Sequence, residues 1–309
     1  MQEYTSPSER LKALTDQLEQ GVSDIFQSGQ YAAYLTAMSK FHHYSFGNTM
    51  LIFIQCPNAT HVAGYHDWRR NFGRQVKRGE RGITILAPCP YRRQEEVEEA
   101  ASDGSSSTSI QWVQRIGFRT VTVFDVSQTE GKPLPELAKK LTGDAAQYES
   151  MVAALRGISP YPISIEPFPG GAYGCCDFVE QRILVQPDMS QTQTIKTMIH
   201  EVSHAKLHAP PEKTEELPQH KQRFVREMEA ESVAYVVCRH FGIDTSDYSF
   251  GYVAGWSRGR ELSQLRESLD LIRNTAAELI DGISPPRELT PPAQKKQRTK
   301  TRRYTYERS

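Results

Sequence analysis

The chain has 309 residues, with 37 basic and 37 acidic side chains and therefore no formal net charge, so only the distribution of charge can indicate a nucleic-acid partner. It has no run of about 18 apolar residues, and its first residues lack the apolar segment of a secretory signal, so we expect neither a membrane protein nor an exported one. The five cysteines follow no repeated spacing, which argues against a disulfide framework and predicts the reducing cytoplasm as the location.

The first part of the chain is predicted to combine helices with one strand pair. Apolar residues recur at three- and four-residue steps, as on the buried face of a helix: Leu11, Leu14, Leu18, Val22 and Ile25. Two further helices are expected over residues 31–41 and 48–55. Residues 82–88 and 112–126 are rich in β-branched and aromatic side chains, so we expect two strands that pair with each other.

An acidic stretch separates these two strands. It contains Glu95, Glu96, Glu98, Glu99 and Asp103 and leads into Gly104 and three serines. No apolar period supports a packed element there, so we expect a disordered insertion at about residues 92–110, in the loop between the strands.

The second half is predicted to be α+β, a small sheet backed by helices. Two prolines mark a linker near residues 130–136. Strands are expected at residues 163–167 and 181–187, on either side of a glycine-rich segment. Asp188 and Ser190 are candidate caps of a helix. The helices are expected at residues 136–155, 192–208, 220–240 and 259–280.

The last residues, 285–309, carry eight basic side chains, two acidic ones and four prolines. This composition predicts a disordered basic tail. Such a tail is either a solvated end or a further contact with nucleic acid.

The most specific pattern in the sequence is His200-Glu201-Val202-Ser203-His204. It lies in an apolar-periodic stretch and is therefore expected on a helix, where positions four apart share one face and both imidazoles can reach one Zn²⁺ ion. Glu201 is placed to act as the general base of a metal-assisted hydrolase. The competing interpretation is two surface histidines that flank a glutamate by chance.

A third zinc ligand is expected on the next helix, which carries Glu227, Glu229 and Glu231. Glu227 and Glu231 are four residues apart and share a face, whereas Glu229 points elsewhere and is expected in solvent. We assign Glu227 as the ligand and expect Glu231 to hold a ligand histidine in its tautomer. An acidic face exposed to solvent is the alternative for all three residues.

Two further groups near this pattern are less specific. His208 lies one turn beyond His204, where it either interacts with the C-terminal dipole of the helix or is a fourth polar neighbour of the site. A donor that stabilises the transition state, such as Tyr235 or a residue of the segment 249–256, cannot be selected from the sequence.

A basic cluster lies between residues 67 and 81, with six basic side chains against two acidic ones and hence a net charge of +4. Basic groups pair with phosphates, and interleaved aromatic rings stack on bases, so a nucleic-acid contact is expected. A solvated loop is the alternative, and Trp68 and Phe46 fit a core equally well. The expected contact residues are Lys40, His42, Tyr44, Asn48, Arg69, Arg70, Arg74, Lys77, Arg78 and Arg81.

Two family resemblances rest on these segments. The pattern at His200–His204 and the later Glu-Met-Glu-Ala-Glu at Glu227–Glu231 resemble the ImmA/IrrE-type metallopeptidase domain, which implies that Glu227 is the third zinc ligand. Glu231 stands where that family often has Asn. Residues 41–88 and 124–136 resemble the N-terminal single-stranded-DNA-binding domain of ArdC-type antirestriction proteins.

ArdC-type proteins join such a DNA-binding domain to a zincin-like domain in the same order. The resemblance covers about residues 8–280 and implies a DNA-binding domain over residues 1–132, a metallopeptidase domain over residues 133–284 and a tail at residues 285–309. It implies an antirestriction protein of a plasmid or another mobile element, acting during conjugation. Its cofactor would be Zn²⁺, and its partners would be single-stranded DNA and a protein substrate of unknown identity.

Two other functions remain open at this point. One is a DNA-binding protein whose zinc site is structural or vestigial. The intact Glu201 argues against it, because a structural site has no need of a general base. The other is a peptidase that cleaves a repressor and has no DNA affinity, and the charge of the basic cluster argues against that.

Overall fold

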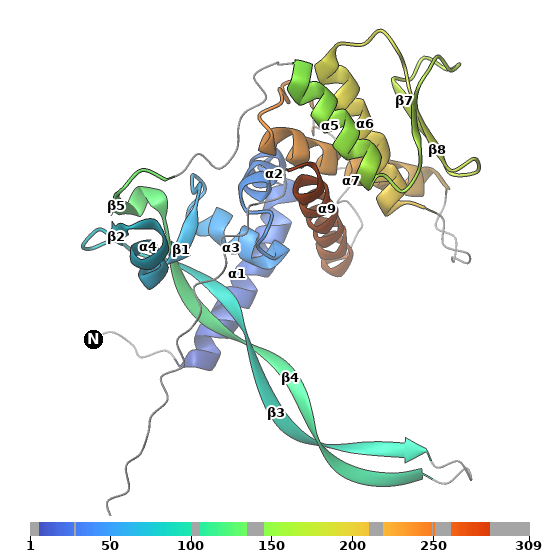
Figure 1. Ribbon diagram of the computed structural model, residues 1–309. Coiled ribbons are helices and arrows are strands. Elements are labelled where there is room, and N and C mark those ends of the chain that lie inside the picture. Colours follow the sequence, from blue (N-terminus) through green and yellow to red (C-terminus); the bar gives the residue numbers. More distant parts are fainter. Residues whose placement is uncertain are drawn as a thin grey trace, which may run out of the picture.

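The computed structural model describes residues 6–27, 29–100, 106–134, 145–209, 219–248, 250 and 261–284, and Figure 1 shows the arrangement of their helices and strands. The fold class is α+β, as predicted. The helices are α1 (Pro7–Gln27), α2 (Tyr31–Lys40), α3 (Phe46–Gln55), α4 (Tyr65–Phe72), α5 (Ala145–Ile158), α6 (Gln191–Leu207), α7 (Gln219–His240) and α9 (Leu262–Ile283). The strands are β1 (Val62–Gly64), β2 (Arg74–Val76), β3 (Ile83–Ala100), β4 (Ser106–Asp125), β5 (Thr129–Gly131), β6 (Ile163–Ile165), β7 (Gly174–Asp177) and β8 (Arg182–Val185). None of the described helices is long and apolar enough to cross a membrane.

The first three helices pack through the apolar faces that the sequence predicts. The stripe of α1 is buried at Leu14, Leu18, Val22 and Ile25. Ser45 begins α3, because its Oγ accepts a hydrogen bond from the backbone N–H of Asn48 at 3.3 Å, which satisfies one of the free donors of a helix N-terminus. Helix α3 in turn contacts β3, so the helical layer supports the base of the strand pair.

Strands β3 and β4 form a long antiparallel hairpin that projects from the rest of the molecule (Figure 1). The predicted pairing is confirmed, but the expected disorder at residues 92–110 is wrong, because β3 continues to Ala100 and β4 begins at Ser106. Residues 101–105 lie outside the described residues. The two strands satisfy each other's backbone groups, so the ribbon continues without an apolar period. Large apolar side chains stay exposed along β4: Ile110, Trp112, Ile116 and Phe118.

A small unit of α4, β2 and β5 contains much of the basic cluster at residues 67–81, where a solvated loop was the alternative (Figure 1). Trp68 on α4 is fully buried, and its indole N–H donates to the carbonyl of Phe124 at 2.9 Å, so Trp68 is a core residue and no stacking surface. Gly73 ends α4 with a φ of 62°, a left-handed conformation that glycine adopts without strain.

The second half contains the small sheet that the sequence predicts, in the order β6, β8, β7. β6 is parallel to β8, and β7 is antiparallel to it. The strands expected at residues 163–167 and 181–187 are confirmed as β6 and β8, whereas β7 forms within the segment expected only to be rich in glycine. β7 is the edge strand next to α6 (Figure 1). The linker and the start of the helix expected at residues 130–155 fall partly outside the described residues, and the basic tail at 285–309 does so entirely.

Helix α2 from the first part packs directly against α7 from the second. The hydroxyl of Tyr31 lies 2.9 Å from Oγ of Ser232, and Oγ1 of Thr36 lies 3.0 Å from the hydroxyl of Tyr235. One buried apolar cluster contains residues of both parts. The two sequence segments that meet near residue 132 therefore share a core in the fold.

Candidate metal centre

Helix α6 presents the first two candidate ligands on one face. Ser190 caps the helix, because its Oγ accepts from the backbone N–H of Gln193 at 3.2 Å, and the helix then runs unbroken through the predicted pattern. The Nε2 atoms of His200 and His204 lie 3.0 Å apart. The four-residue spacing thus brings the two imidazoles together, as the sequence predicts.

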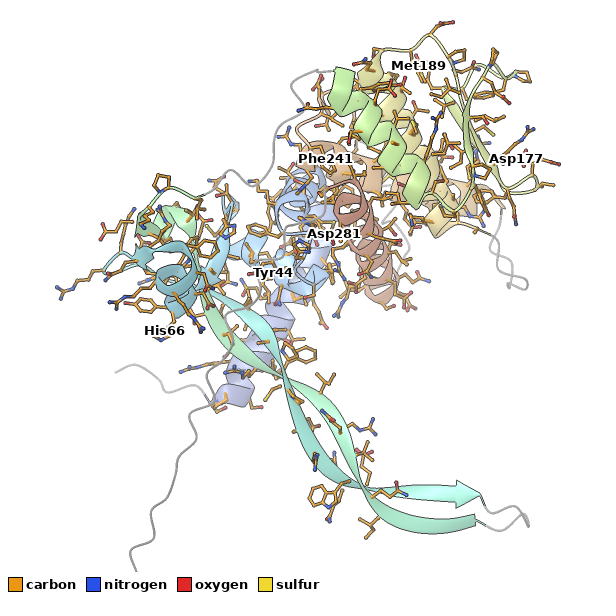
Figure 2. All side chains as sticks on the ribbon, viewed as in Figure 1. Tyr44, His66, Asp177, Met189, Phe241 and Asp281 are labelled. Atoms are coloured by element: carbon orange, nitrogen blue, oxygen red, sulfur yellow. The ribbon has the colours of Figure 1, made fainter. Side chains whose placement is uncertain are left out.

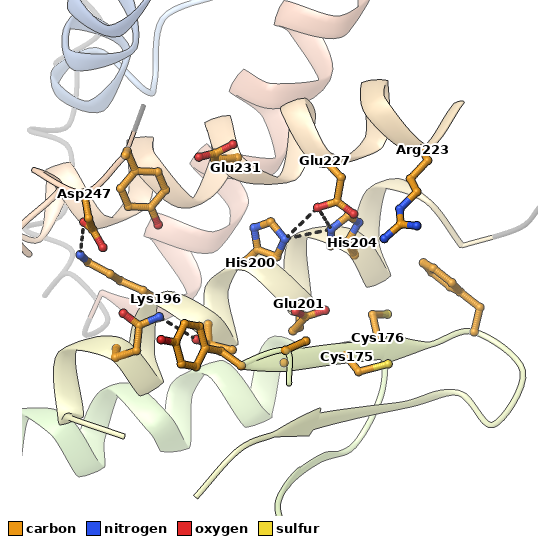
Figure 3. Close-up of a pocket in the computed structure, with 17 residues that line it drawn as sticks. Cys175, Cys176, Lys196, His200, Glu201, His204, Arg223, Glu227, Glu231 and Asp247 are labelled. Atoms are coloured by element: carbon orange, nitrogen blue, oxygen red, sulfur yellow. Dashed lines mark hydrogen bonds and ion pairs between the residues drawn. The ribbon is translucent and has the colours of Figure 1, made fainter. Parts of the chain in front are cut away.

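Helix α7 supplies the third candidate ligand. Oε2 of Glu227 lies 3.5 Å from Nε2 of His200 and 3.5 Å from Nε2 of His204 (Figure 3). The hydrogen bonds with the two histidines hold the pKa of Glu227 far below its usual range. Burial opposes protonation of His200, but the hydrogen bond with Glu227 and the nearby carboxylates outweigh it and raise the pKa of His200.

The geometry of this trio fits a metal ion. Two nitrogen atoms and one carboxylate oxygen converge with all separations within 4.8 Å. Ligand atoms bound tetrahedrally at about 2.0–2.1 Å are separated by about 3.4 Å, close to the three distances in the structure. Glu227 is half exposed and the histidines are more buried, so one side of the trio stays open to the cleft. We therefore treat His200, His204 and Glu227 as a cluster able to hold one divalent metal ion.

Glu201 lies next to these residues and points into the same cleft (Figure 3). Burial raises its pKa to about 7, although the charge of His200 and a hydrogen bond from the backbone N–H of Cys176 act in the opposite direction. The backbone of β7 passes very close: a Cβ atom on Gly174 would lie 2.7 Å from Oε1 of Glu201. Only glycine at this position leaves room for the carboxylate.

Glu229 is not in solvent, and that expectation is wrong. Its side chain is buried, with Oε2 at 3.1 Å from Nε2 of His208 and Oε1 accepting a hydrogen bond from the hydroxyl of Ser268 at 2.6 Å. Nδ1 of His208 lies 3.0 Å from Nδ1 of His204. The helix turn places Glu229 inward because α9 packs on that face of α7 and brings Ser268 to it.

Of the two alternatives that the sequence leaves for His208, the structure confirms a polar neighbour of the site. His208 forms the C-terminal cap of α6, with its N–H donating to the carbonyl of His204 at 2.9 Å. Its buried ring is also a polar neighbour of the cluster. Glu231 lines the cleft, and its charge helps to raise the pKa of His200. That Glu231 sets the tautomer of a ligand histidine stays a prediction.

The cluster lies in a cleft of about 680 Å³ between β7, α6 and α7. Lys196, Asp247 and Tyr248 are residues of this cleft that were not predicted. Nζ of Lys196 bonds to Asp247 at 2.6 Å and lies 5.6 Å from the ring centre of Tyr248, and all three line the cleft. Lys196 is four residues before His200, so the helical spacing could have revealed it. Tyr248 follows a loop and has no spacing to show it. Tyr235, named from the sequence as a candidate donor, bonds instead to Thr36.

The basic residues predicted to bind nucleic acid divide into two groups. The side chain of Arg74 donates to Oγ1 and to the carbonyl of Thr129 at 2.7 and 2.9 Å, and Nζ of Lys77 donates to the carbonyl of Ser127 at 2.9 Å. These two cations hold the small unit together. The other four are exposed: Arg69 and Arg70 on α4, and Arg78 and Arg81 in the segment that follows β2.

The upstream residues of the same prediction lie elsewhere and make contacts within the protein. Asn48 bonds with both its amide nitrogen and its oxygen to the backbone of Leu86, at 2.8 and 2.9 Å. Tyr44 donates to the carbonyl of Val62 at 3.3 Å, and Lys40 to that of Ala59 at 3.3 Å. His42 is buried. The structure does not bring these four side chains onto the surface of the small unit, and their role toward nucleic acid stays a prediction.

Fold and site together define an α+β protein with a His–His–Glu cluster in a cleft and exposed arginines on a separate small unit. Residues 8–124 match the family model of the N-terminal domain of anti-restriction factor ArdC. The first part of the chain is therefore a domain of the ArdC type, as the sequence predicts.

Two further proteins are similar to this chain, one of them in two crystal structures. The uncharacterized protein pXO2-81 of Bacillus anthracis is 24% identical over 279 residues, which is 80% of this chain and 46% of that protein, so the chain spans less than half of this relative. The antirestriction ArdC protein from the R388 plasmid is similar in its metal-free crystal structure, with 20% identity, a TM-score of 0.45 and coverage of 78% of this chain and 82% of that one. Its Mn(II)-bound structure gives 19% identity, a TM-score of 0.49 and coverage of 86% and 95%.

Proposed function

We propose that the chain is an antirestriction-type protein of a mobile element that binds single-stranded DNA and carries a zinc-dependent peptidase site. The observation that carries the peptidase half of this proposal is the convergence of His200, His204 and Glu227 beside a buried Glu201. The match of residues 8–124 to the ArdC N-terminal domain supports the antirestriction half.

The donor set favours zinc. Two imidazoles and one carboxylate with an open side are typical of catalytic zinc sites. When bound there, zinc would polarise a substrate carbonyl and make a water molecule nucleophilic at neutral pH. Glu201 lines the same cleft and would act as the general base, taking a proton from the attacking water and giving one to the leaving amine. A structural site would have no use for a carboxylate buried in this position.

The edge strand beside the cleft supports a peptide as the substrate. β7 is paired with β8 on one side only, and its residues Gly174, Cys175 and Cys176 line the cleft. An extended peptide can add to such an edge through backbone hydrogen bonds, which would place its scissile bond over the cluster. Lys196 lies in the same cleft and could donate to the developing oxyanion.

The small unit of α4, β2 and β5 is the proposed DNA surface. Arg69 and Arg70 are exposed on α4, and Arg78 and Arg81 are exposed in the segment that follows β2. Tyr65, which is 49% exposed, offers an aromatic ring on the same helix as Arg69 and Arg70. Phosphates pair with the guanidinium groups, and a splayed base can stack on the ring. A contact of this kind should show little preference for the base sequence of the DNA.

Glu201→Gln tests the peptidase half. The substitution keeps the size of the side chain and leaves the three ligands untouched, so the protein should retain its zinc. Cleavage of unfolded casein should fall by about 10²-fold or more, the usual scale for loss of a general base. His204→Ala should instead empty this site of zinc. A Glu201→Gln protein that cleaves as fast as the parent would show that the cleft does not work in this way.

Charge reversal of the four exposed arginines tests the DNA half. Replacing them by Glu should weaken binding of a single-stranded oligonucleotide and flatten the log–log salt dependence, to which each phosphate contact contributes about 0.7. Replacing Arg74 by Glu is the contrasting variant. Because Arg74 bonds within the protein, this change should lower the free energy of unfolding and leave the salt dependence of DNA binding nearly unchanged. Unchanged affinity in the fourfold variant would contradict the proposal.

A second candidate function is protection by DNA binding alone, with no role for proteolysis. The domain match supports it, because the matched residues lie outside the cleft. Transfer of unmodified DNA into a restricting host separates the two. If protection survives Glu201→Gln but not the fourfold arginine reversal, DNA binding is sufficient. If Glu201→Gln abolishes protection while DNA affinity is normal, proteolysis is the operative step.

A further inference from the structure

A second cluster of metal-ligating side chains lies where the turn between α2 and α3 approaches α9. His42 and His43 are in the turn between α2 and α3, and Asp281 is near the end of α9. Each offers one ligand atom, and the three atoms lie within 4.8 Å of one another. None of these residues belongs to the cleft around His200.

The distances in this cluster suit a metal ion better than a direct ion pair. Oδ1 of Asp281 lies 3.6 Å from Nε2 of His43 and 3.9 Å from Nε2 of His42. Both separations are too long for a hydrogen bond. They exceed the edge of a tetrahedral zinc site, about 3.4 Å, by only a few tenths of an ångström. One carboxylate oxygen thus faces two imidazole nitrogens at once, as in the cluster of α6 and α7.

The surroundings of His42 hold one side of the cluster in place. Its ring centre lies 4.7 Å from that of His240, edge to face, and 4.0 Å from that of His43. Nδ1 of His240 lies 2.8 Å from the carbonyl of Ser39 and must donate to it. His42 is buried, whereas His43 and Asp281 are half exposed, so the remaining coordination positions would be open to water.

We propose that His42, His43 and Asp281 form a second divalent-metal site, selective for ions that accept imidazole and carboxylate ligands, such as Zn²⁺. The ligands come from residues far apart in sequence, and the site joins the turn after α2 to α9. Metal bound there fastens the first part of the chain to the last described helix.

Metal counting on the full chain tests this site. The protein is stripped with EDTA, equilibrated with excess Zn²⁺, desalted and analysed for zinc by mass spectrometry. We expect two ions per chain in the parent and one in His43→Ala, in Asp281→Asn and in His204→Ala. His43→Ala and Asp281→Asn change half-exposed side chains and should fold normally. In both variants the rise in melting temperature caused by zinc should be smaller than in the parent.

His66→Ala is the matched control, because His66 is an exposed histidine on α4, well away from Asp281 (Figure 2). It should keep both ions. Zinc contents of His43→Ala and Asp281→Asn equal to that of the parent would overturn the proposal. A parent that binds one ion, lost in His204→Ala, would overturn it too. Neither result would touch the proposed peptidase site, which depends on different residues.

Discussion

Oε2 of Glu229 lies 3.1 Å from Nε2 of His208, inside the helix pair that carries the candidate metal ligands. The other ring nitrogen of His208 lies 3.0 Å from Nδ1 of His204. If Glu229 is ionised, it accepts the Nε2 proton of His208, whose Nδ1 then accepts the Nδ1 proton of His204. This assignment leaves Nε2 of His204 unprotonated, which is the state that a metal ligand needs.

Glu229→Gln should therefore weaken zinc binding at the His200 cluster by about 10–100-fold, the usual scale for losing a group that orients a ligand histidine. Zinc affinity would be measured by competition with a chromophoric chelator under conditions where the variant is folded. Glu231→Gln is the matched variant. A larger loss of affinity in Glu231→Gln than in Glu229→Gln would support the role that the sequence suggests for Glu231.

Gly174→Ala should disturb Glu201 without removing a metal ligand. The new Cβ would lie 2.6 Å from Cγ2 of Thr197 and 2.7 Å from Oε1 of Glu201, distances that force the strand or the carboxylate to move. We expect the protein to keep its zinc, to melt at a lower temperature and to lose peptidase activity. Gly157→Ala is the control, because no atom lies within 4 Å of a Cβ there and alanine favours the helix. Equal melting temperatures for the two variants would contradict this account.

Asp125 should contribute stability that depends on pH. Its carboxylate is buried and accepts hydrogen bonds from the backbone N–H groups of Thr60, His61 and Ser127 at 2.8, 3.1 and 2.9 Å. Burial raises its pKa, but a hydrogen bond from the hydroxyl of Ser127 at 2.6 Å and these backbone bonds outweigh it and lower the pKa below the ordinary value. The contribution is complete above the pKa of the unfolded chain, about 3.9, and is lost as the pH falls through the lower folded value.

Asp125→Asn should consequently cost about 1–3 kcal/mol at pH 7, because a buried acceptor is replaced by a donor. The difference from the parent should shrink at pH values below the folded pKa. Urea unfolding at neutral and strongly acidic pH measures it. Asp16→Asn, at an exposed position of α1, should show little change at either pH. A difference for Asp125→Asn that widens on acidification would show that the sign is wrong.

Tyr235→Phe should lower the stability of the whole chain and not of the second half alone. The substitution removes the hydroxyl that lies 3.0 Å from Thr36 across the contact of α2 with α7, at a cost of about 0.5–1.5 kcal/mol. Because the two parts share a core, probes in both should report the same lowered unfolding midpoint. Tyr173→Phe, at a side chain that is 62% exposed, is the control. Separate transitions for the two parts would favour the independent domains expected from the sequence.

The sequence predicts the helices well, because their apolar spacing is long and regular, and it predicts the His–His–Glu cluster, because helical geometry fixes which residues share a face. It cannot predict the burial of Glu229, since that depends on α9 packing against α7 and bringing Ser268 to it. The sequence also does not predict the length of the β3–β4 hairpin. Backbone hydrogen bonds between β3 and β4 extend the hairpin through residues whose side chains show no alternation of buried and exposed positions.

Contacts between distant segments explain the other differences. Arg74 looks like a phosphate ligand in the sequence, yet it bonds to Thr129 on the neighbouring strand. The short helix α4 is not predicted, because its eight residues make too few turns to show a repeat of apolar side chains. Trp68 is its only buried side chain. The closeness of His42, His43 and Asp281 could not be expected, because nothing in the sequence relates a turn after α2 to the end of α9.

The projecting β3–β4 hairpin has a consequence for how large this molecule looks in solution. β3 alone has 18 residues and spans about 60 Å at about 3.3 Å per residue. A compact chain of 309 residues would have a radius of gyration of about 19 Å, and β3 is about three times as long as that radius. A monomer should therefore elute early in gel filtration, with an apparent mass closer to that of a dimer. Light scattering, which reports mass and not drag, would give the true number of chains.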